Sequence, residues 1–154
     1  MSDAANILIV EGRFYEDIAD EMFKGAGKVL DDADMGYERL AVPGAFEIPQ
    51  AIRMAIRSME IGSANNRYAG FIGLGCVIRG DTSHYDYVCQ ESARALMDIP
   101  MIYSVALGYG ILTCETREQA WERADVTKKN KGGAVAEACL RMMEVKKHLR
   151  LVLR

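Results

Sequence analysis

The sequence predicts an α/β protein, a three-layer α/β/α sandwich around a four-stranded parallel sheet. Short apolar or β-branched runs alternate along the chain with longer stretches of helical spacing, which is the pattern that successive βα units produce. The chain has 154 residues, enough for one domain to bury its own core. Neither an internal repeat nor a low-complexity linker divides it, so we expect a single domain over residues 1–154.

The first half of the chain contains two predicted βα units. The run from Asn6 to Val10 is an almost continuously apolar strand, and apolar residues recur at helical intervals from Phe14 onward. Tyr37 to Val42 has the composition of a second strand, and a helix is expected from about Ile48 to Met59. The polar pair Asn65-Asn66 then indicates a loop.

The second half continues the alternation. Ala69 to Ile78 is the most strand-like stretch, and a helix is expected from His84 to about Met97. A fourth strand is predicted from Ile102 to Leu112, and a short helix from Arg117 to Arg123. A loop at Lys131-Gly132-Gly133 would precede the last helix. Joined by right-handed crossovers, these elements give an architecture that resembles the flavodoxin fold.

Composition excludes several classes of protein. The formal net charge is -3, charged residues make up 27% of the chain, and no long run of one sign suggests nucleic acid or membrane as a partner. No apolar run approaches the length of a membrane span, and no basic segment precedes the first strand. The four cysteines are widely spread without a C-x-x-C pair, so we expect buried, reduced thiols and a cytoplasmic location.

The loops that follow the strands are candidate sites, because ligands of open parallel sheets bind at the carboxyl ends of the strands. The loop from Arg79 to Ser83 contains Gly80 and leads directly into a helix N-terminus. Free N–H groups and the helix dipole make such a place an anion site. Ser83 and Asp86 also have the spacing of a capping box, which would give a well-capped helix with nothing bound. The residues alone leave both interpretations open.

Three further residues are candidates for chemistry or binding. His84 would stand in the first helical turn, where the dipole favours a neutral imidazole that accepts a proton, although a surface histidine fits equally. Glu47 would offer an acceptor in the tight turn after the second strand. Phe14 follows the first strand and would either pack in the core, the simpler interpretation, or stack on a planar heterocycle. The other histidine, His148, is expected to be exposed.

Four strings resemble, in the same order, the motifs of lumazine synthases. They are Gly12-Arg13-Phe14, VPGAFEIP from Val42 to Pro49, GCVIRGDTSHYDYVC from Gly75 to Cys89, and ETREQAWERA from Glu115 to Ala124. The third string is the most specific, and the resemblance spans nearly the whole chain. Three positions depart from the residues usual in the family, namely Tyr15, Asp81 and Tyr109.

The resemblance implies an enzyme of riboflavin biosynthesis that uses no cofactor. Lumazine synthases condense 5-amino-6-(D-ribitylamino)uracil with 3,4-dihydroxy-2-butanone 4-phosphate, which requires proton transfers, a phosphate cradle and orientation of the two substrates. The sequence agrees, because it contains neither a metal-ligand cluster nor a dinucleotide fingerprint. His84 would transfer protons. Substrate would contact Phe14, Ala45, Phe46, Glu47, Val77, Ile78, Asp81 and Thr82 of one chain and Tyr109, Arg123 and Lys131 of its neighbour.

The resemblance also implies a homo-oligomer with sites between subunits. Shell-forming members carry a longer segment before the first strand than Met1 to Ala5, and glycines where this chain reads Asp125 to Asn130. A pentamer that does not close into a shell is therefore expected. Two other functions stay open at this point. One is a shell or carrier without turnover, and the other is a flavin-binding module or an enzyme that dismutates lumazine to riboflavin.

Overall fold

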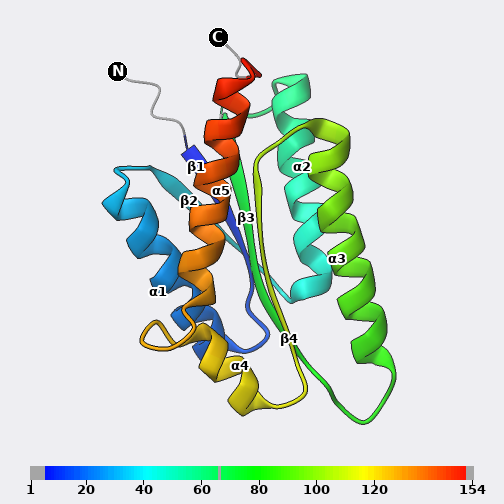
Figure 1. Cartoon of the computed structure of the whole chain (residues 1–154). Coiled ribbons are helices and arrows are strands. Elements are labelled where there is room, and N and C mark those ends of the chain that lie inside the picture. Colours follow the sequence, from blue (N-terminus) through cyan, green and yellow to red (C-terminus); the bar gives the residue numbers. More distant parts are fainter. Residues whose placement is uncertain (1–5, 66, 152–154) are drawn as a thin grey trace.

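Four parallel strands form one sheet in the order β2-β1-β3-β4, as the computed structural model of the chain shows (Figure 1). The structure describes residues 6–65 and 67–151. The strands are β1 (Asn6–Gly12), β2 (Tyr37–Val42), β3 (Tyr68–Ile78) and β4 (Leu107–Cys114). All three strand pairs are parallel, so every strand ends at the same edge of the sheet, at the bottom of Figure 1.

Helices cover both faces of the sheet, which confirms the predicted three-layer sandwich. One face carries α1 (Glu16–Asp32), α4 (Arg117–Ala124) and α5 (Lys131–His148), and the other carries α2 (Ile48–Ile61) and α3 (His84–Tyr103) (Figure 1). A short 3-10 helix, η1 (Ala45–Glu47), leads into α2. Among the described residues, no helix is long and apolar enough to cross a membrane.

Two cores result, one on each face of the sheet. Along β1, Ile7 and Ile9 point into the core beneath α1 and α5, while Leu8 and Val10 point into the core beneath α2 and α3. This arrangement explains why the first strand is apolar at successive positions, since both of its faces are covered. Burying a polar or charged side chain in such a strand costs free energy unless the group is paired. Glu11, which is buried on the α1 side, is therefore an exception that needs an explanation.

The fourth strand begins later than its sequence predicts. Ile102 lies in the last turn of α3, which continues past Pro100 to Tyr103 and ends where Ser104 adopts a left-handed conformation (φ 52°). β4 starts only at Leu107 and continues to Cys114. The prediction was wrong because the apolar run from Ile102 to Leu107 spans a helix end, a loop and a strand start, and periodicity does not separate these in so short a run.

The last helix begins at the glycines that were expected to form a loop. Gly132 and Gly133 are buried in the first turn of α5, and a Cβ at Gly132 would lie 2.0 Å from the carbonyl oxygen of Met22. These glycines therefore let α5 approach α1 closely. Asn130 caps the helix, its side chain accepting a bond from Gly133 N–H, and it is left-handed (φ 44°), a conformation that asparagine tolerates.

Two segments singled out in the sequence fall partly or wholly outside the described residues. Met1 to Ala5 lie outside them, as does Asn66 of the predicted loop, whereas Asn65 lies between α2 and β3 as expected. In the segment from Asp125 to Asn130, only Asn130 is left-handed. The positions where family members carry glycine therefore need no glycine for the turn seen here.

Candidate functional site

The loops after β1 and β2 are packed directly against each other. Arg13 N–H donates a 3.1 Å bond to the carbonyl oxygen of Val42. A Cβ at Gly12 would lie 2.7 Å from the carbonyl carbon of Gly44 and 2.9 Å from the nitrogen of Ala45. Only a glycine at position 12 permits this approach, so the two loops form one rigid unit.

Phe14 is presented by this unit to solvent. Its side chain is 73% exposed and stands edge-on to Tyr15, with 4.9 Å between ring centroids. The core-packing interpretation of Phe14 was therefore wrong, and the ring is free to stack on a flat ligand. Glu47 lies close by, because its Oε2 and the Cβ of Phe14 both come within 4.0 Å of the place a Cβ would take on Gly44.

The residues next to Glu47 differ in exposure to solvent. Ala45, the first residue of η1, is buried, while Phe46 is 56% exposed. Pro49 lies within the first turn of α2, a position that does not need an N–H donor. The sequence thus places Phe14, Phe46 and Glu47 together at the carboxyl ends of β1 and β2.

The loop after β3 presents unpaired backbone donors. Asp81, Thr82 and His84 are all exposed, and within the part of the chain that the structure describes no acceptor takes the N–H of Asp81 or Thr82. The side-chain bond of a capping box is not formed, because Ser83 makes no side-chain cap and Asp86 pairs with Arg79 instead. These donors at the N-terminus of α3 are suited to an anion.

Arg79 ties this loop to its surroundings, which the sequence did not reveal. Its Nε donates a 2.7 Å bond to Glu115 and its Nη2 a 3.2 Å bond to Asp86, while its guanidinium lies 4.3 Å from the centroid of the Tyr85 ring. Because two carboxylates already neutralise Arg79, it holds the loop in place and leaves the anion to the N–H groups. The IRGD string contains the arginine, but its partners are 7 and 36 residues away.

Val77 and Ile78 lie at the end of β3 but on opposite sides of the sheet. Val77 packs on the core beneath α2 and α3, and Ile78 on the core beneath α1, α4 and α5. Successive residues of a strand point to opposite faces. Within one chain, a ligand on one face of the sheet can therefore contact only one of these two side chains.

Three predicted residues come from other elements, and among the described residues no hydrogen bond, ion pair or ring contact joins them to Phe14 or Glu47. Tyr109 is the third residue of β4, the edge strand opposite β2. Burial, with a smaller contribution from the nearby Cys89, raises the pKa of its hydroxyl. Arg123 lies in the last turn of α4 and donates a 3.0 Å bond to the carbonyl oxygen of Gln119. Lys131 is exposed at the start of α5, beside α1.

The cysteines offer no nucleophile at this edge. Cys76, Cys114 and Cys139 are buried and Cys89 is half-buried, largely as expected. Burial raises the pKa of the Cys76 and Cys139 thiols to about 12, which leaves almost no thiolate at neutral pH. Among the described residues, no group of three His, Cys, Asp or Glu side chains lies close enough to hold a metal ion.

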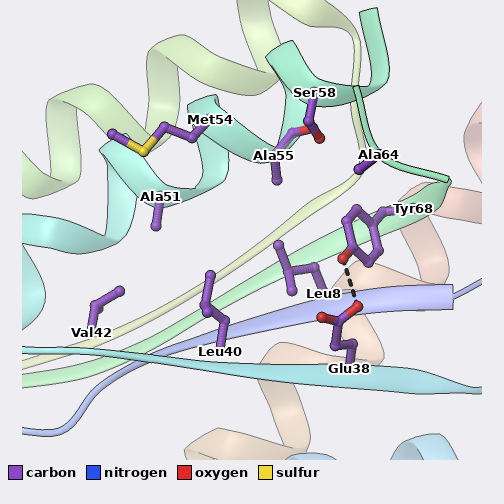
Figure 2. Close-up of a pocket in the computed structure, with 10 residues that line it drawn as sticks. All are labelled: Leu8, Glu38, Leu40, Val42, Ala51, Met54, Ala55, Ser58, Ala64 and Tyr68. Carbon is purple, nitrogen blue, oxygen red and sulfur yellow. Dashed lines mark hydrogen bonds between the residues drawn. The ribbon is translucent and has the colours of Figure 1, made fainter. Parts of the chain in front are cut away.

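A hollow of about 420 Å³ lies elsewhere, between the β2 edge of the sheet and α2. Figure 2 shows Leu40 and Val42 of β2 facing Ala51 and Met54 of α2 across it, with the Tyr68 hydroxyl donating a 2.6 Å bond to Glu38 at one end. Its lining is mainly apolar, and none of the predicted site residues contributes to it. It is therefore a separate surface feature and not the candidate site.

Comparison with known proteins gives a consistent result. Residues 4–147 match the family described as 6,7-dimethyl-8-ribityllumazine synthase. A Rhizobium meliloti protein named 6,7-dimethyl-8-ribityllumazine synthase 1 is 54% identical over 94% of this chain and 93% of its own length. Proteins named 6,7-dimethyl-8-ribityllumazine synthase from Agrobacterium fabrum and Paramagnetospirillum magneticum are 49% and 46% identical, over 94% and 96% of this chain and 96% and 98% of theirs.

Proposed function

Because this chain belongs to the 6,7-dimethyl-8-ribityllumazine synthase family, we propose that it makes 6,7-dimethyl-8-ribityllumazine in riboflavin biosynthesis. The substrates are 5-amino-6-(D-ribitylamino)uracil and 3,4-dihydroxy-2-butanone 4-phosphate. The amine and the ketone condense to an imine with loss of water, phosphate is eliminated, and the ring closes with loss of a second water. The observation that carries the proposal is the family match, which spans every predicted site residue.

The pyrimidine belongs at the joined loops after β1 and β2. The exposed Phe14 ring offers one flat apolar face for stacking. Glu47 stands beside it and accepts hydrogen bonds from the ribityl chain or the ring edge, with Ala45 and Phe46 forming the adjoining wall. Val77 closes the far side at the end of β3, on the face covered by α2 and α3, whereas Ile78 adjoins the site from the opposite face.

The phosphate belongs at the start of α3. The free N–H groups of Asp81 and Thr82 point to an acceptor that must be supplied from outside the described residues, and the helix dipole favours a negative charge there. A carboxylate beside phosphate is unfavourable, so the exposed Asp81 side chain turns to solvent while its N–H binds. His84 follows directly and transfers protons between the reacting groups.

A neighbouring subunit completes the site. Tyr109, Arg123 and Lys131 come from β4, α4 and α5 and make no contact with Phe14 among the described residues, which supports their contribution to the site of the next subunit. The chain also exposes apolar side chains on β2, α2 and α3, namely Leu40, Met54, Met97, Met101 and Ile102, of which Leu40 and Met54 line the apolar hollow of Figure 2. Such surfaces are typical of subunit contacts.

A homopentamer satisfies these requirements, because head-to-tail contacts close after one turn of a ring and repeat the same shared site. Light scattering coupled to size exclusion should give a mass of five times 17.1 kDa, or twice that if rings stack. A megadalton particle would contradict the open ring, and a monomer active at high dilution would contradict the shared site. The buried, unpaired thiols support the cytoplasm as the compartment.

The test of the activity is direct. Purified protein is mixed with both substrates, and formation of the fluorescent lumazine is followed above the uncatalysed rate. Lumazine production that scales with enzyme concentration is the expected result. A protein that binds flavin or assembles without producing lumazine would instead be a binding module or a shell, and the proposed function would be wrong.

A further inference from the structure

A buried carboxylate lies directly beneath the loop that carries Phe14. Glu11 is the penultimate residue of β1 and only 2% exposed. It follows Ile9 on the α1 side of the sheet, the side opposite Val10. A buried charge is retained only where partners compensate its desolvation, so its contacts show what it does.

Two arginines form hydrogen bonds with both oxygens of this carboxylate. Arg39 donates 2.7 Å and 3.0 Å bonds to the two oxygens of Glu11, and Arg13 adds a 2.8 Å bond to one of them. Arg13 also donates a 2.5 Å bond to Asp20 of α1, and the Arg39 guanidinium lies 3.4 Å from the centroid of the Phe23 ring. With both oxygens bound by guanidinium groups and only 2% of the residue exposed, Glu11 does not contact a substrate directly.

The cluster of Glu11, Arg13 and Arg39 is connected to the candidate site through Arg13. Arg13 immediately precedes Phe14, and its side chain is fixed by Glu11 and Asp20 while its N–H is fixed by Val42. Gly12, on its other side, lies against Gly44 and Ala45. The backbone orientation at Phe14, and with it that of the loop bearing Glu47, therefore depends on Arg13 remaining where Glu11 holds it.

We propose that Glu11 is a positioning residue for pyrimidine binding, acting through Arg13 on the Phe14 loop. The inference rests on the proposed function, which supplies the pyrimidine as the ligand. Without the negative charge, the guanidinium groups of Arg13 and Arg39 repel each other across a neutral side chain. Arg13 then swings toward Asp20 and solvent, and Phe14 loses its fixed orientation. The phosphate loop, at the end of β3, is not touched by this cluster.

The test is Glu11→Gln, a change of charge with little change of shape. The Michaelis constant for the pyrimidine should rise about tenfold, whereas that for the phosphorylated butanone should stay within about twofold of wild type. Glu60→Gln is the matched control, because Glu60 also lies between two arginines, Arg53 and Arg57, but on the far end of α2. It should change neither constant.

Two further variants separate positioning from general loss of structure. Arg13→Gln leaves Glu11 paired with Arg39 through two bonds, so the chain still folds, and it should raise the same Michaelis constant. Adding Arg39→Gln to Glu11→Gln removes the repulsion and should bring the constant back to within about threefold of wild type, a non-additive result. A purely structural role predicts instead that the two defects add.

The outcomes also distinguish this inference from the proposed function. A wild-type chain that forms lumazine, with Glu11→Gln and Arg13→Gln both keeping the wild-type Michaelis constant for the pyrimidine, would overturn the role of Glu11 alone. Equal increases for both substrates would overturn it too. A wild-type chain that forms no lumazine would overturn the proposed function. Calorimetric titration with the pyrimidine alone gives the same comparison as a dissociation constant, independently of turnover.

Discussion

Arg79 donates a 2.7 Å hydrogen bond from Nε to Glu115, and this pair joins the loop after β3 to the loop after β4. The same arginine reaches Asp86 in the first turn of α3, so one side chain spans both ends of the loop from Gly80 to Ser83. The N–H groups of that loop are the proposed phosphate ligands. Their direction is set by the backbone, and the backbone is held by these exposed ion pairs.

Replacing Glu115 by Gln should therefore affect phosphate binding more than stability. Both side chains are largely exposed, so the unfolding free energy should fall by less than about 1 kcal/mol. The Michaelis constant for the phosphorylated butanone should rise about three- to tenfold, because the loop loses part of its orientation. Steady-state kinetics and urea titration measure the two effects. Glu144→Gln, which removes the exposed partner of Arg141 on α5, is the control, and an identical kinetic change there would contradict the argument.

Gly12→Ala should destabilise the chain and weaken pyrimidine binding together. The added methyl group would lie within 3.0 Å of three backbone atoms of Gly44 and Ala45, which have no room to move without separating the two loops. Forcing an extra carbon into so close a contact typically costs about 1 to 3 kcal/mol. The free energy of unfolding is measured by urea titration. Gly80→Ala serves as the stability control, since nothing lies within 4 Å of its added Cβ. Equal stability of the two variants would show that the loops are not locked.

His84→Ala should lower turnover by about 10²- to 10⁴-fold with little change in either Michaelis constant, the usual scale for one acid-base group. His84 is exposed beside the free N–H groups and forms no ion pair with any residue that the structure describes, so its removal should leave the fold intact. Initial rates are corrected for the uncatalysed reaction. His148→Ala, at the end of α5, should behave as wild type. If His84→Ala kept full turnover but bound substrate more weakly, His84 would be a binding residue and its proposed proton-transfer role would be wrong.

The fold was predictable because its signals are local and repeated. Alternation of apolar runs and helical spacing identified all four strands and their order along the chain, and turn residues such as Pro43-Gly44 marked their ends. Errors arose where a contact distant in sequence decides the structure. Gly132 belongs to a helix because Met22 of α1 lies against it. Ile102 belongs to a helix although its neighbours are typical of a strand.

The site was predictable only in part, for the same reason. Loops after parallel strands and a helix N-terminus pointed to the Asp81–His84 segment and to Phe14 and Glu47, and motif resemblance gave these residues their expected roles. Glu11 gave a signal, a carboxylate within an apolar strand, but its partner Arg39 is 28 residues away. The pairing of Arg79 with Glu115 across 36 residues had no local signature either. The residues proposed to bind substrate lie in motifs, whereas the residues that hold their loops in place are recognised from their contacts.

Arg123→Ala should raise the Michaelis constant for the phosphorylated butanone far more than that for the pyrimidine. Among the side chains of the loop from Gly80 to Ser83 there is no cation, so a charge-assisted bond from Arg123 would be lost, at a cost of about 1.5 to 3 kcal/mol. Within its own chain Arg123 donates a hydrogen bond to the carbonyl oxygen of Gln119 and lies on α4, on the other side of the sheet from α3. Its partner is therefore expected to be the phosphate of the adjacent subunit.

Subunit mixing tests this sharing directly. When Arg123→Ala and His84→Ala chains are co-expressed with different tags and purified through both, random assembly in a ring gives about a quarter of the sites an intact His84 from one chain and an intact Arg123 from the next. At a butanone concentration far below the Michaelis constant of Arg123→Ala, the mixed oligomer should then recover about a quarter of the wild-type rate, well above either parent alone. A mixture of Glu144→Gln and His84→Ala, treated identically, measures the activity expected when the first chain carries no site defect. If the doubly tagged His84→Ala and Arg123→Ala oligomers show only the summed activity of their parents, the two residues act within one chain, and the site is not shared.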